Sequence, residues 1–220
     1  MVNIIWDLDG TLIDSSKEIM QSLELAINNS GLDLSKQIKP FIIGPTIDVI
    51  VKEAFPPETV TEDTLKMVIK SFREIYDYSD FRHTKSYSGL DSIISDVKNF
   101  IHHIVTNKPD MPAKRIIEKL KWTDYITSIQ TPYSKLHNMN NEKQSKSDIM
   151  AEIIKKSDTN RSSFIGIGDM KADCIAAKSN NIKAIGVLWG TGTREELIDC
   201  CDYVSENAKQ LSDYLYASIN

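Results

Sequence analysis

Short apolar runs alternate with helix-like patterns along most of the chain. The runs, each the length of one buried strand, lie at residues 2–6, 101–105, 125–129, 163–167, 184–188 and 203–204. Between the runs, apolar residues recur at helical spacing, as Ile93, Ile94 and Val97 do. Strands that alternate with helices predict a parallel sheet with helices on both of its faces. We therefore expect an α/β, Rossmann-like fold.

Residues 15–83 do not follow this alternation of strands and helices, because they contain helical stripes but no convincing pair of strands. Apolar residues recur at helical spacing over residues 17–29, 47–54 and 65–76. We expect residues 15–83 to form a small α-helical bundle of the usual size for a small domain. This bundle would be a cap domain, inserted into a catalytic core made of residues 1–14 and 84–220.

The first strand ends in the octapeptide Asp7-Leu8-Asp9-Gly10-Thr11-Leu12-Ile13-Asp14. Residues two apart on a strand point to the same side, so Asp7 and Asp9 are expected to project together from its carboxyl end. Two carboxylates this close repel each other, and a hard divalent cation bound by oxygen ligands relieves that repulsion. The plain alternative is a strand that ends in an Asx-type turn at Gly10, which gives no reason for two alternating acids.

Polar residues stand at the ends of two later strands as well, namely Thr106 with Asn107, and Gly168, Asp169 and Asp173. Ligands bind beyond the carboxyl ends of the strands in an open parallel sheet. Just before the strand that ends near Asp169, a helix opens with Lys146, whose ammonium group can reach the same place. Each residue alone is weak evidence, but their convergence predicts one site.

The residue types at this site suggest phosphoryl transfer. Asp7, Asp9 and Asp169 supply the hard oxygen ligands that hold Mg²⁺ together with waters and a substrate phosphate. Asp7 is the candidate nucleophile, which would form an aspartyl-phosphate. Asp9 is the candidate general acid and base, because it can protonate the leaving oxygen and later deprotonate the attacking water.

Other groups at the same strand ends are candidates for binding the phosphate. Lys146, Thr106 and the backbone N–H groups after Asp7, including that of Gly10, would bind the non-bridging oxygens. Asn107 adds an amide beside Thr106. The expected substrate is therefore a small phosphorylated metabolite.

Composition and charge exclude several classes of partner. The 220 residues are 41% hydrophobic and 26% charged, which is ordinary for a globular protein. A net charge of −5 argues against binding to nucleic acid or to an anionic membrane. No signal peptide or membrane-spanning stretch fits the sequence, so we expect a cytoplasmic protein. A monomer and a homodimer both remain open.

The three cysteines are Cys174, Cys200 and Cys201. An odd number with two adjacent suits a reducing compartment rather than a disulfide framework. None lies in a C-x-x-C spacing, which argues against a zinc site. Cys174 falls within a helical pattern and is expected to be a small packed side chain.

The stretch from Asp7 to Ser15 resembles the first motif of the haloacid dehalogenase-like superfamily of phosphohydrolases. Thr106 resembles its second motif, Lys146 its third, and Gly168-Asp169-Met170-Lys171-Ala172-Asp173 its fourth, in the same order and spacing. The resemblance covers residues 2–202. The helical insert after the first motif resembles the subclass with an α-helical cap, which includes phosphoglycolate phosphatases, pyrophosphatases and β-phosphoglucomutases.

The resemblance implies a magnesium ion held by the Asp7 side chain, the Asp9 backbone carbonyl and Asp169. It places Asp173 in or beside this set of ligands. The Asp9 side chain then stays free for acid–base work, in agreement with the role argued above. The dehalogenases of the superfamily lack this second acid, so Asp9 favours phosphate chemistry.

The third motif, the polar loop before it and a loop in the cap each differ from the family pattern or extend it. Lys146 lacks the proline that often follows this lysine in the family, and Lys143 lies nearby as an alternative. The polar loop over residues 131–145 is longer than expected, which favours a surface insertion, with a substrate or partner element as the alternative. In the cap, Gly44 and Thr46 are candidates for substrate specificity, with an ordinary helix connection as the alternative.

The leading prediction is a magnesium-dependent phosphatase of small phosphomonoesters, with phosphoglycolate as the first substrate to test. A phosphosugar mutase of the β-phosphoglucomutase kind is the second, since it uses the same aspartyl-phosphate. The segment Asp9-Gly10-Thr11-Leu12 favours hydrolysis over the mutase. An inorganic pyrophosphatase and a catalytically inactive regulatory protein are further alternatives.

Overall fold

The chain folds into two compact units in the computed structural model, which describes residues 1–132, 144–157 and 159–219. The first unit contains residues 1–14 and 85–220, and the second contains residues 15–84. The chain therefore leaves the first unit directly after the octapeptide and returns to it some 70 residues later.

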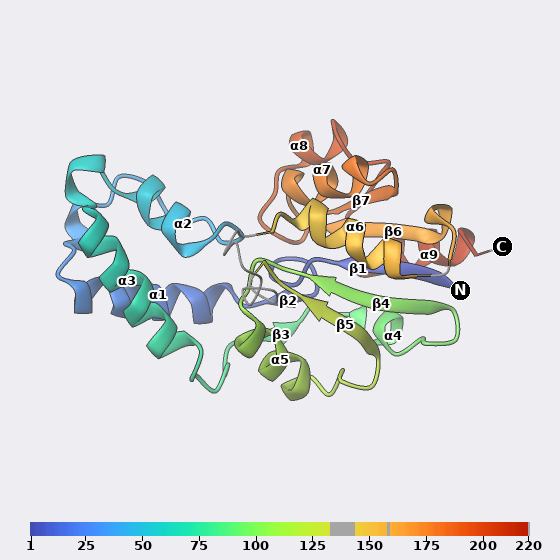
Figure 1. Cartoon of the computed structure of the whole chain (residues 1–220), viewed down its shortest axis with the longest axis horizontal. Coiled ribbons are helices and arrows are strands. Elements are labelled where there is room, and N and C mark those ends of the chain that lie inside the picture. Colours follow the sequence, from blue (N-terminus) through green and yellow to red (C-terminus); the bar gives the residue numbers. More distant parts are fainter. Residues whose placement is uncertain (133–143, 158, 220) are drawn as a thin grey trace. The chain divides into compact units, whose positions relative to one another are not determined.

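The first unit is built on a six-stranded parallel sheet (Figure 1). In spatial order its strands are β5 (Ile126–Gln130), β4 (Phe100–Val105), β1 (Val2–Trp6), β6 (Phe164–Gly168), β7 (Lys183–Val187) and β8 (Tyr203–Ser205). Strand β1 lies inside the sheet, where Ile4 pairs with His102 on one side and Ile165 on the other. The prediction of a Rossmann-like parallel sheet is confirmed.

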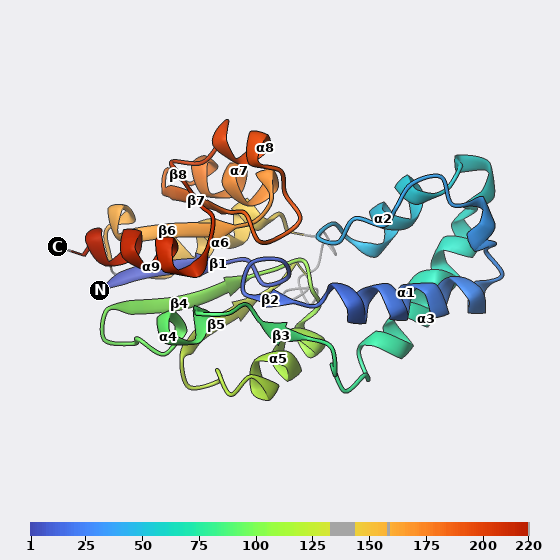
Figure 2. The ribbon, with the colours of Figure 1, turned by 180° about the vertical axis from the view of Figure 1, so that it is seen from behind.

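Helices cover both faces of this sheet. They are α4 (Leu90–Ile94), α5 (Asp110–Lys119), α6 (Lys146–Lys156), α7 (Lys171–Ser179), α8 (Arg194–Ile198) and α9 (Ala208–Ala217). Helices α6 and α7 lie on one face, and α4 and α9 lie on the other (Figures 1 and 2). Helix α4 is shorter than expected, because it ends before Val97, which is 47% exposed.

A small antiparallel pair, β2 (Ile13–Asp14) and β3 (Lys85–Ser86), was not expected from the sequence. Each strand has only two residues, too few to show a period. The pair joins the two segments at which the chain leaves and re-enters the first unit.

The second unit consists mainly of helices α1 (Ser16–Ser30), α2 (Ile47–Ala54) and α3 (Glu62–Tyr76). Short 3₁₀ turns lie at Leu34–Lys36 and Pro57–Thr59, and a third, Arg161–Ser163, lies in the first unit. Leu23 and Ile27 on α1, and Val68 and Phe72 on α3, are buried at helical spacing. Burial of these apolar stripes between helices stabilises the unit.

Within the described part of the chain, every helix is too short or too polar to span a lipid bilayer.

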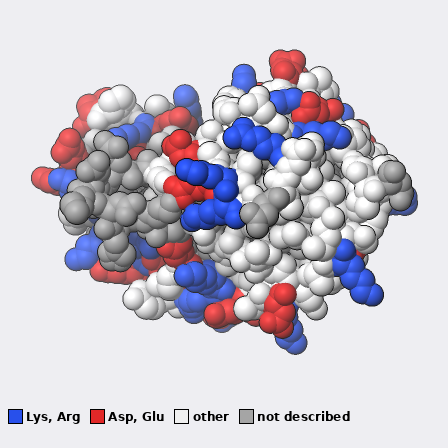
Figure 3. Space-filling model, turned by 45° about the vertical axis from the view of Figure 1, so that its right-hand side comes forward, with Lys and Arg blue, Asp and Glu red and all other residues white. Residues whose placement is uncertain are grey.

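On the face shown in Figure 3, Lys and Arg side chains lie among Asp and Glu side chains rather than forming one continuous patch.

The core of the first unit depends on a close approach between α7 and β6. A Cβ atom added at Gly166 on β6 would lie 2.7 Å from the Cβ of Ala177 on α7. Glycine at this position therefore lets α7 lie directly on the sheet, which fixes the residues that α7 carries.

We expect Gly166→Ala to destabilise the protein by about 1–3 kcal/mol, because the added methyl group overpacks this contact. Ala177→Gly removes the opposing methyl group at a cost of about 1 kcal/mol in helix propensity. The double variant should lose about 1 kcal/mol less free energy of unfolding than the sum of the two single losses. Urea unfolding of the four proteins measures this coupling, and strictly additive effects would contradict the contact.

A buried histidine makes the stability depend on pH. The Nε1 atom of Trp6 donates a hydrogen bond to Nδ1 of His102 at 3.0 Å, and both residues are fully buried. Burial, with a smaller effect of His103, lowers the pKa of His102 to about 4. The folded state therefore favours neutral His102, and this stabilisation is present above about pH 6.5 and lost as the pH falls towards 4.

The pKa shift of His102 corresponds to a loss of up to about 3 kcal/mol in the free energy of unfolding on acidification. We expect His102→Gln to lose less stability than the wild type between about pH 7 and about pH 4.5. Chemical unfolding at both pH values measures the difference. Equal losses in the two proteins would show that His102 does not cause the acid sensitivity.

Candidate active site

The turn after β1 places two acids at the carboxyl edge of the sheet. The Asp7 N–H donates to the Ile167 carbonyl at 2.8 Å, which extends the pairing of β1 with β6 by one residue. The chain then turns tightly, since the Leu8 carbonyl accepts hydrogen bonds from the N–H groups of Leu12 and Ile13 at 2.9 and 3.0 Å. The Asp7 side chain is thereby buried at the end of the central strand.

Gly10 makes this turn possible. Its φ of +83° lies in the left-handed region, and a Cβ atom there would collide with the Asp169 carboxylate. The Gly10 N–H donates to the Ile13 carbonyl at 2.9 Å. The expectation that this N–H binds phosphate therefore needs correction: it is used inside the turn, and Gly10 shapes the site instead.

Three buried carboxylates meet at this edge. Oxygen atoms of Asp7, Asp169 and Asp173 lie within 4.8 Å of one another. Burial raises the pKa of Asp7 well above its usual value, against the opposing effect of Lys146, and the charges of Asp173 and Asp169 raise it further. Burial also raises the pKa of Asp169. A positively charged group beside these carboxylates would therefore favour their ionised forms.

Lys146 supplies one such charge. Its Nζ atom donates to Oδ1 of Asp7 at 2.7 Å and to Oδ1 of Asp173 at 2.6 Å. Burial opposes the charged form, but Asp173 and Asp7 outweigh it and raise the pKa of Lys146. Lys143, the alternative from the sequence, lies outside the described residues.

A capping box determines where α6 begins and hence where Lys146 lies. The Ser145 hydroxyl accepts from the Asp148 N–H, and the Asp148 carboxylate accepts from the Ser145 N–H, each at 3.2 Å. Lys146 is thus the first residue of α6, with its side chain directed to the carboxylates. The pattern Ser-x-x-Asp in the sequence is a signal for this helix start.

Hydroxyl and amide groups orient Asp169. Its Oδ1 atom accepts from the Thr11 hydroxyl at 3.1 Å. Its Oδ2 atom accepts from the N–H and the hydroxyl of Thr191 at 2.8 and 3.0 Å. A Cβ atom at Gly190 would also collide with Asp169, which explains the glycine next to Thr191. The loop after β7 is therefore part of the site, a role that its sequence alone did not indicate.

Lys108 is a second buried cation that the sequence analysis missed. Its Nζ atom lies 3.0 Å from Oδ1 of Asp9, and its side chain is only 3% exposed. The Lys108 N–H donates to the Thr106 hydroxyl at 3.1 Å, and Asn107 lies between the two residues. Lys108 follows the same strand end as Thr106, and that position was the available signal.

The structure thus brings Asp7, Asp169, Asp173 and Lys146 into one cluster and connects Asp9 to Thr106 through Lys108. The cap candidates belong to the second unit: Gly44 has a φ of +127°, and Thr46 precedes α2 without a capping bond from its side chain. Their contribution to specificity stays a prediction.

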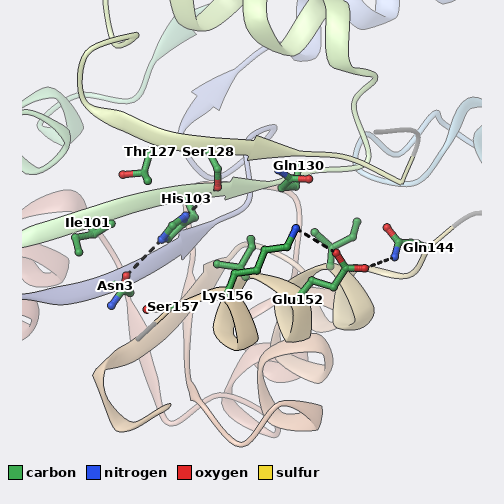
Figure 4. A pocket seen from close by; sticks show the side chains of 12 residues that line it. Asn3, Ile101, His103, Thr127, Ser128, Gln130, Gln144, Glu152, Lys156 and Ser157 are labelled. Carbon is green, nitrogen blue, oxygen red and sulfur yellow. Dashed lines mark hydrogen bonds and ion pairs between the residues drawn. The ribbon is translucent and has the colours of Figure 1, made fainter. Parts of the chain in front are cut away.

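A hollow of about 350 Å³ lies elsewhere, among β1, β4, β5 and α6 (Figure 4). His103 points into it and contacts Ser128 and Asn3 at 2.9 and 3.4 Å. Burial lowers the pKa of His103 to about 4. None of the carboxylates at the sheet edge lines this hollow, so it is separate from the candidate active site.

We expect Lys146→Met to lower the free energy of unfolding by about 3–5 kcal/mol at neutral pH, because it leaves buried carboxylates without their cation. The loss should shrink on acidification, since protonation removes the uncompensated charges. Lys156→Met on the same helix is the control, because Lys156 is exposed and lies 3.8 Å from Glu152. Similar losses in the two variants, measured by urea unfolding without magnesium, would contradict this account.

Several curated proteins are similar to this chain. The 5′-nucleotidase of Pseudomonas aeruginosa is 22% identical over 200 residues, which cover 89% of this chain and 86% of that protein. The phosphoglycolate phosphatase of Aquifex aeolicus is 26% identical, with coverage of 85% and 84%. Tyrosine-protein kinase PtkA of Mycobacterium tuberculosis is 23% identical, but the chain spans only 65% of its length.

Solved structures resemble the whole chain. A predicted phosphatase from Clostridium acetobutylicum superposes with a TM-score of 0.78 at 26% identity and covers 98% of both chains. A haloacid dehalogenase-like family hydrolase from Streptococcus pneumoniae has a TM-score of 0.80 at 18% identity, with coverage of 97% and 98%, and shows the fold alone.

The family description "haloacid dehalogenase-like hydrolase" matches residues 4–187. This range is most of the chain and contains all the carboxylates and both lysines described above. The chain therefore belongs to the haloacid dehalogenase-like hydrolase family, and the resemblance found in its motifs is confirmed.

Proposed function

We propose that this hydrolase is a magnesium-dependent phosphatase that acts on a small phosphomonoester of the phosphoglycolate kind. The proposal rests on one observation, the buried cluster at one edge of the sheet. In it Asp7, Asp169 and Asp173 lie close together, and Lys146 donates hydrogen bonds to two of them. Relatives named phosphoglycolate phosphatase and 5′-nucleotidase support a phosphomonoester as substrate.

The donor atoms fit a magnesium ion. These candidate ligand atoms are the carboxylate oxygens of Asp7 and Asp169 and the backbone carbonyl oxygen of Asp9, and Mg²⁺ prefers oxygen ligands. Burial raises the pKa of Asp7 and Asp169, so a cation between them would favour the ionised forms. Asp7, Asp169 and the Asp9 carbonyl would hold the ion, with Asp173 beside them. When bound, the ion supplies charge neutralisation for the phosphoryl group.

In the first step, a carboxylate oxygen of Asp7 attacks the phosphorus atom, and the bond from phosphorus to the ester oxygen breaks. Asp9 gives its proton to that leaving oxygen, which departs as an alcohol. Lys146 and Thr106 donate hydrogen bonds to the phosphoryl oxygens, with Asn107 beside Thr106. The product is an aspartyl-phosphate on Asp7.

In the second step, Asp9 takes a proton from water, and the water oxygen attacks the phosphorus of the aspartyl-phosphate. The bond from phosphorus to Asp7 breaks, which releases inorganic phosphate and restores both carboxyl groups. The ion pair with Lys108 holds the Asp9 side chain in place between the steps. Lys108 is thus proposed as a positioning residue.

The second unit, residues 15–84, is proposed to act as the cap. A cap excludes water from the reacting groups and adds contacts to the substrate. Gly44 and Thr46 are the residues proposed to contribute those contacts, since the left-handed φ of Gly44 gives this loop a special backbone shape.

We expect the purified protein to release phosphate from phosphoglycolate in the presence of magnesium and to stop when EDTA removes the metal. Asp7→Asn should lower the rate by about 1,000-fold or more, because the amide cannot act as the nucleophile. Phosphate release is measured over a panel that also contains β-glucose 1-phosphate, 5′-nucleotides and pyrophosphate, which ranks the substrate classes.

Asp63→Asn is the matched control, because Asp63 is exposed on α3 and should leave the rate unchanged. If a folded wild-type protein releases phosphate from none of these compounds, the phosphatase proposal is wrong. Isomerisation of β-glucose 1-phosphate without phosphate release would favour the mutase instead.

A further inference from the structure

All three cysteines of the chain gather at one place outside the carboxylate cluster. Cys174 lies on α7, and Cys200 with Cys201 lies just after α8 (both helices are labelled in Figure 1). Their Sγ atoms lie within 4.8 Å of one another. The sequence argued against a zinc site because no C-x-x-C spacing is present, but the fold brings the three thiols together.

The backbone fixes the positions of these thiols. The N–H groups of Cys200 and Cys201 donate to the Leu197 carbonyl at 3.3 and 2.8 Å. A Cβ atom at Gly186 on β7 would lie 3.1 Å from Sγ of Cys201, so this sulfur lies directly over the strand. On the other side, the close contact of Gly166 with Ala177 holds α7, and with it Cys174, against the sheet.

Burial gives the cluster a closed side and an open side. Cys174 is buried in the core, whereas Cys200 and Cys201 are partly exposed. All three thiols are free. Cys200 and Cys201 therefore form the side of the cluster that is nearer to solvent.

We propose that Cys174, Cys200 and Cys201 bind one soft metal ion, Cu(I), through three thiolates. Thiolates select soft ions such as Cu(I). The Sγ atoms of Cys200 and Cys201 are 3.9 Å apart, close to the separation of about 4 Å expected when two sulfurs share an ion at about 2.3 Å. Each thiol that binds releases its proton to solvent.

The number of ligands favours Cu(I) over zinc. Structural zinc sites take four protein ligands, and only these three cysteines form the sulfur cluster among the described residues. The neighbouring carboxylate cluster offers hard oxygens, which suit Mg²⁺. Because Cys174 directly follows Asp173, an ion on the thiols would also restrain the turn of α7 that carries Asp173.

The test titrates fully reduced protein with Cu(I) under anaerobic conditions, in competition with a coloured Cu(I) chelator. We expect one Cu(I) per chain, and protection of three thiols from a thiol-reactive dye. Cys174→Ala, Cys200→Ala and Cys201→Ala should each weaken binding by about 10-fold or more, because losing a ligand costs at least as much as losing a group that only orients one. Circular dichroism checks that each variant is folded.

Asp63→Asn is the matched control, since Asp63 is exposed on α3 and should leave Cu(I) affinity unchanged. Absence of a one-to-one complex with the folded wild type would overturn the proposal. Unchanged affinity in Cys174→Ala, with losses in the other two variants, would also overturn the three-thiolate site, because the adjacent pair alone would then bind the ion.

Discussion

Charge balance among buried carboxylates is the constraint on which this structure depends. Asp7, Asp169 and Asp173 lie within 4.8 Å of one another. A protein interior tolerates such a cluster only when cations and hydrogen-bond donors compensate it. Lys146 bridges two of the acids, while hydroxyl and amide groups hold the third. Burial nevertheless raises the pKa of Asp7 and Asp169, so it disfavours the ionised forms of both carboxyl groups.

The topology explains how residues far apart in the sequence reach this place. Strand β1 lies between β4 and β6, so the first motif stands at the middle of the sheet edge. Asp169 follows β6 on one side, and Thr106 with Lys108 follows β4 on the other. Lys146 comes from the start of α6, whose capping box fixes it there. Asp7, Asp169, Lys108 and Lys146 therefore all follow a strand end or open a helix.

These positions also explain what could be predicted from the sequence. Short apolar runs followed by acids identify strand ends, so Asp7, Asp169 and the parallel sheet could be predicted. Lys108 follows a strand end as well, but its contact with Asp9 and that of Thr191 with Asp169 depend on how a side chain or a loop reaches across from a neighbouring strand. The N–H of Gly10 was assigned to phosphate, but the turn itself uses it. The pair β2–β3 is too short to leave a periodic signal.

Helix α7 contributes one residue to the carboxylate cluster and one to the thiol cluster. Its first turn presents Asp173 to Lys146, and the next residue, Cys174, contributes to the thiol cluster. Successive residues on a helix point in directions about 100° apart, so one turn can serve two separate sites. Hard oxygens on one side and soft sulfurs on the other attract different ions. The same close packing at Gly166 that places α7 on the sheet therefore helps to position Asp173 and Cys174, the residues that α7 contributes to the two clusters.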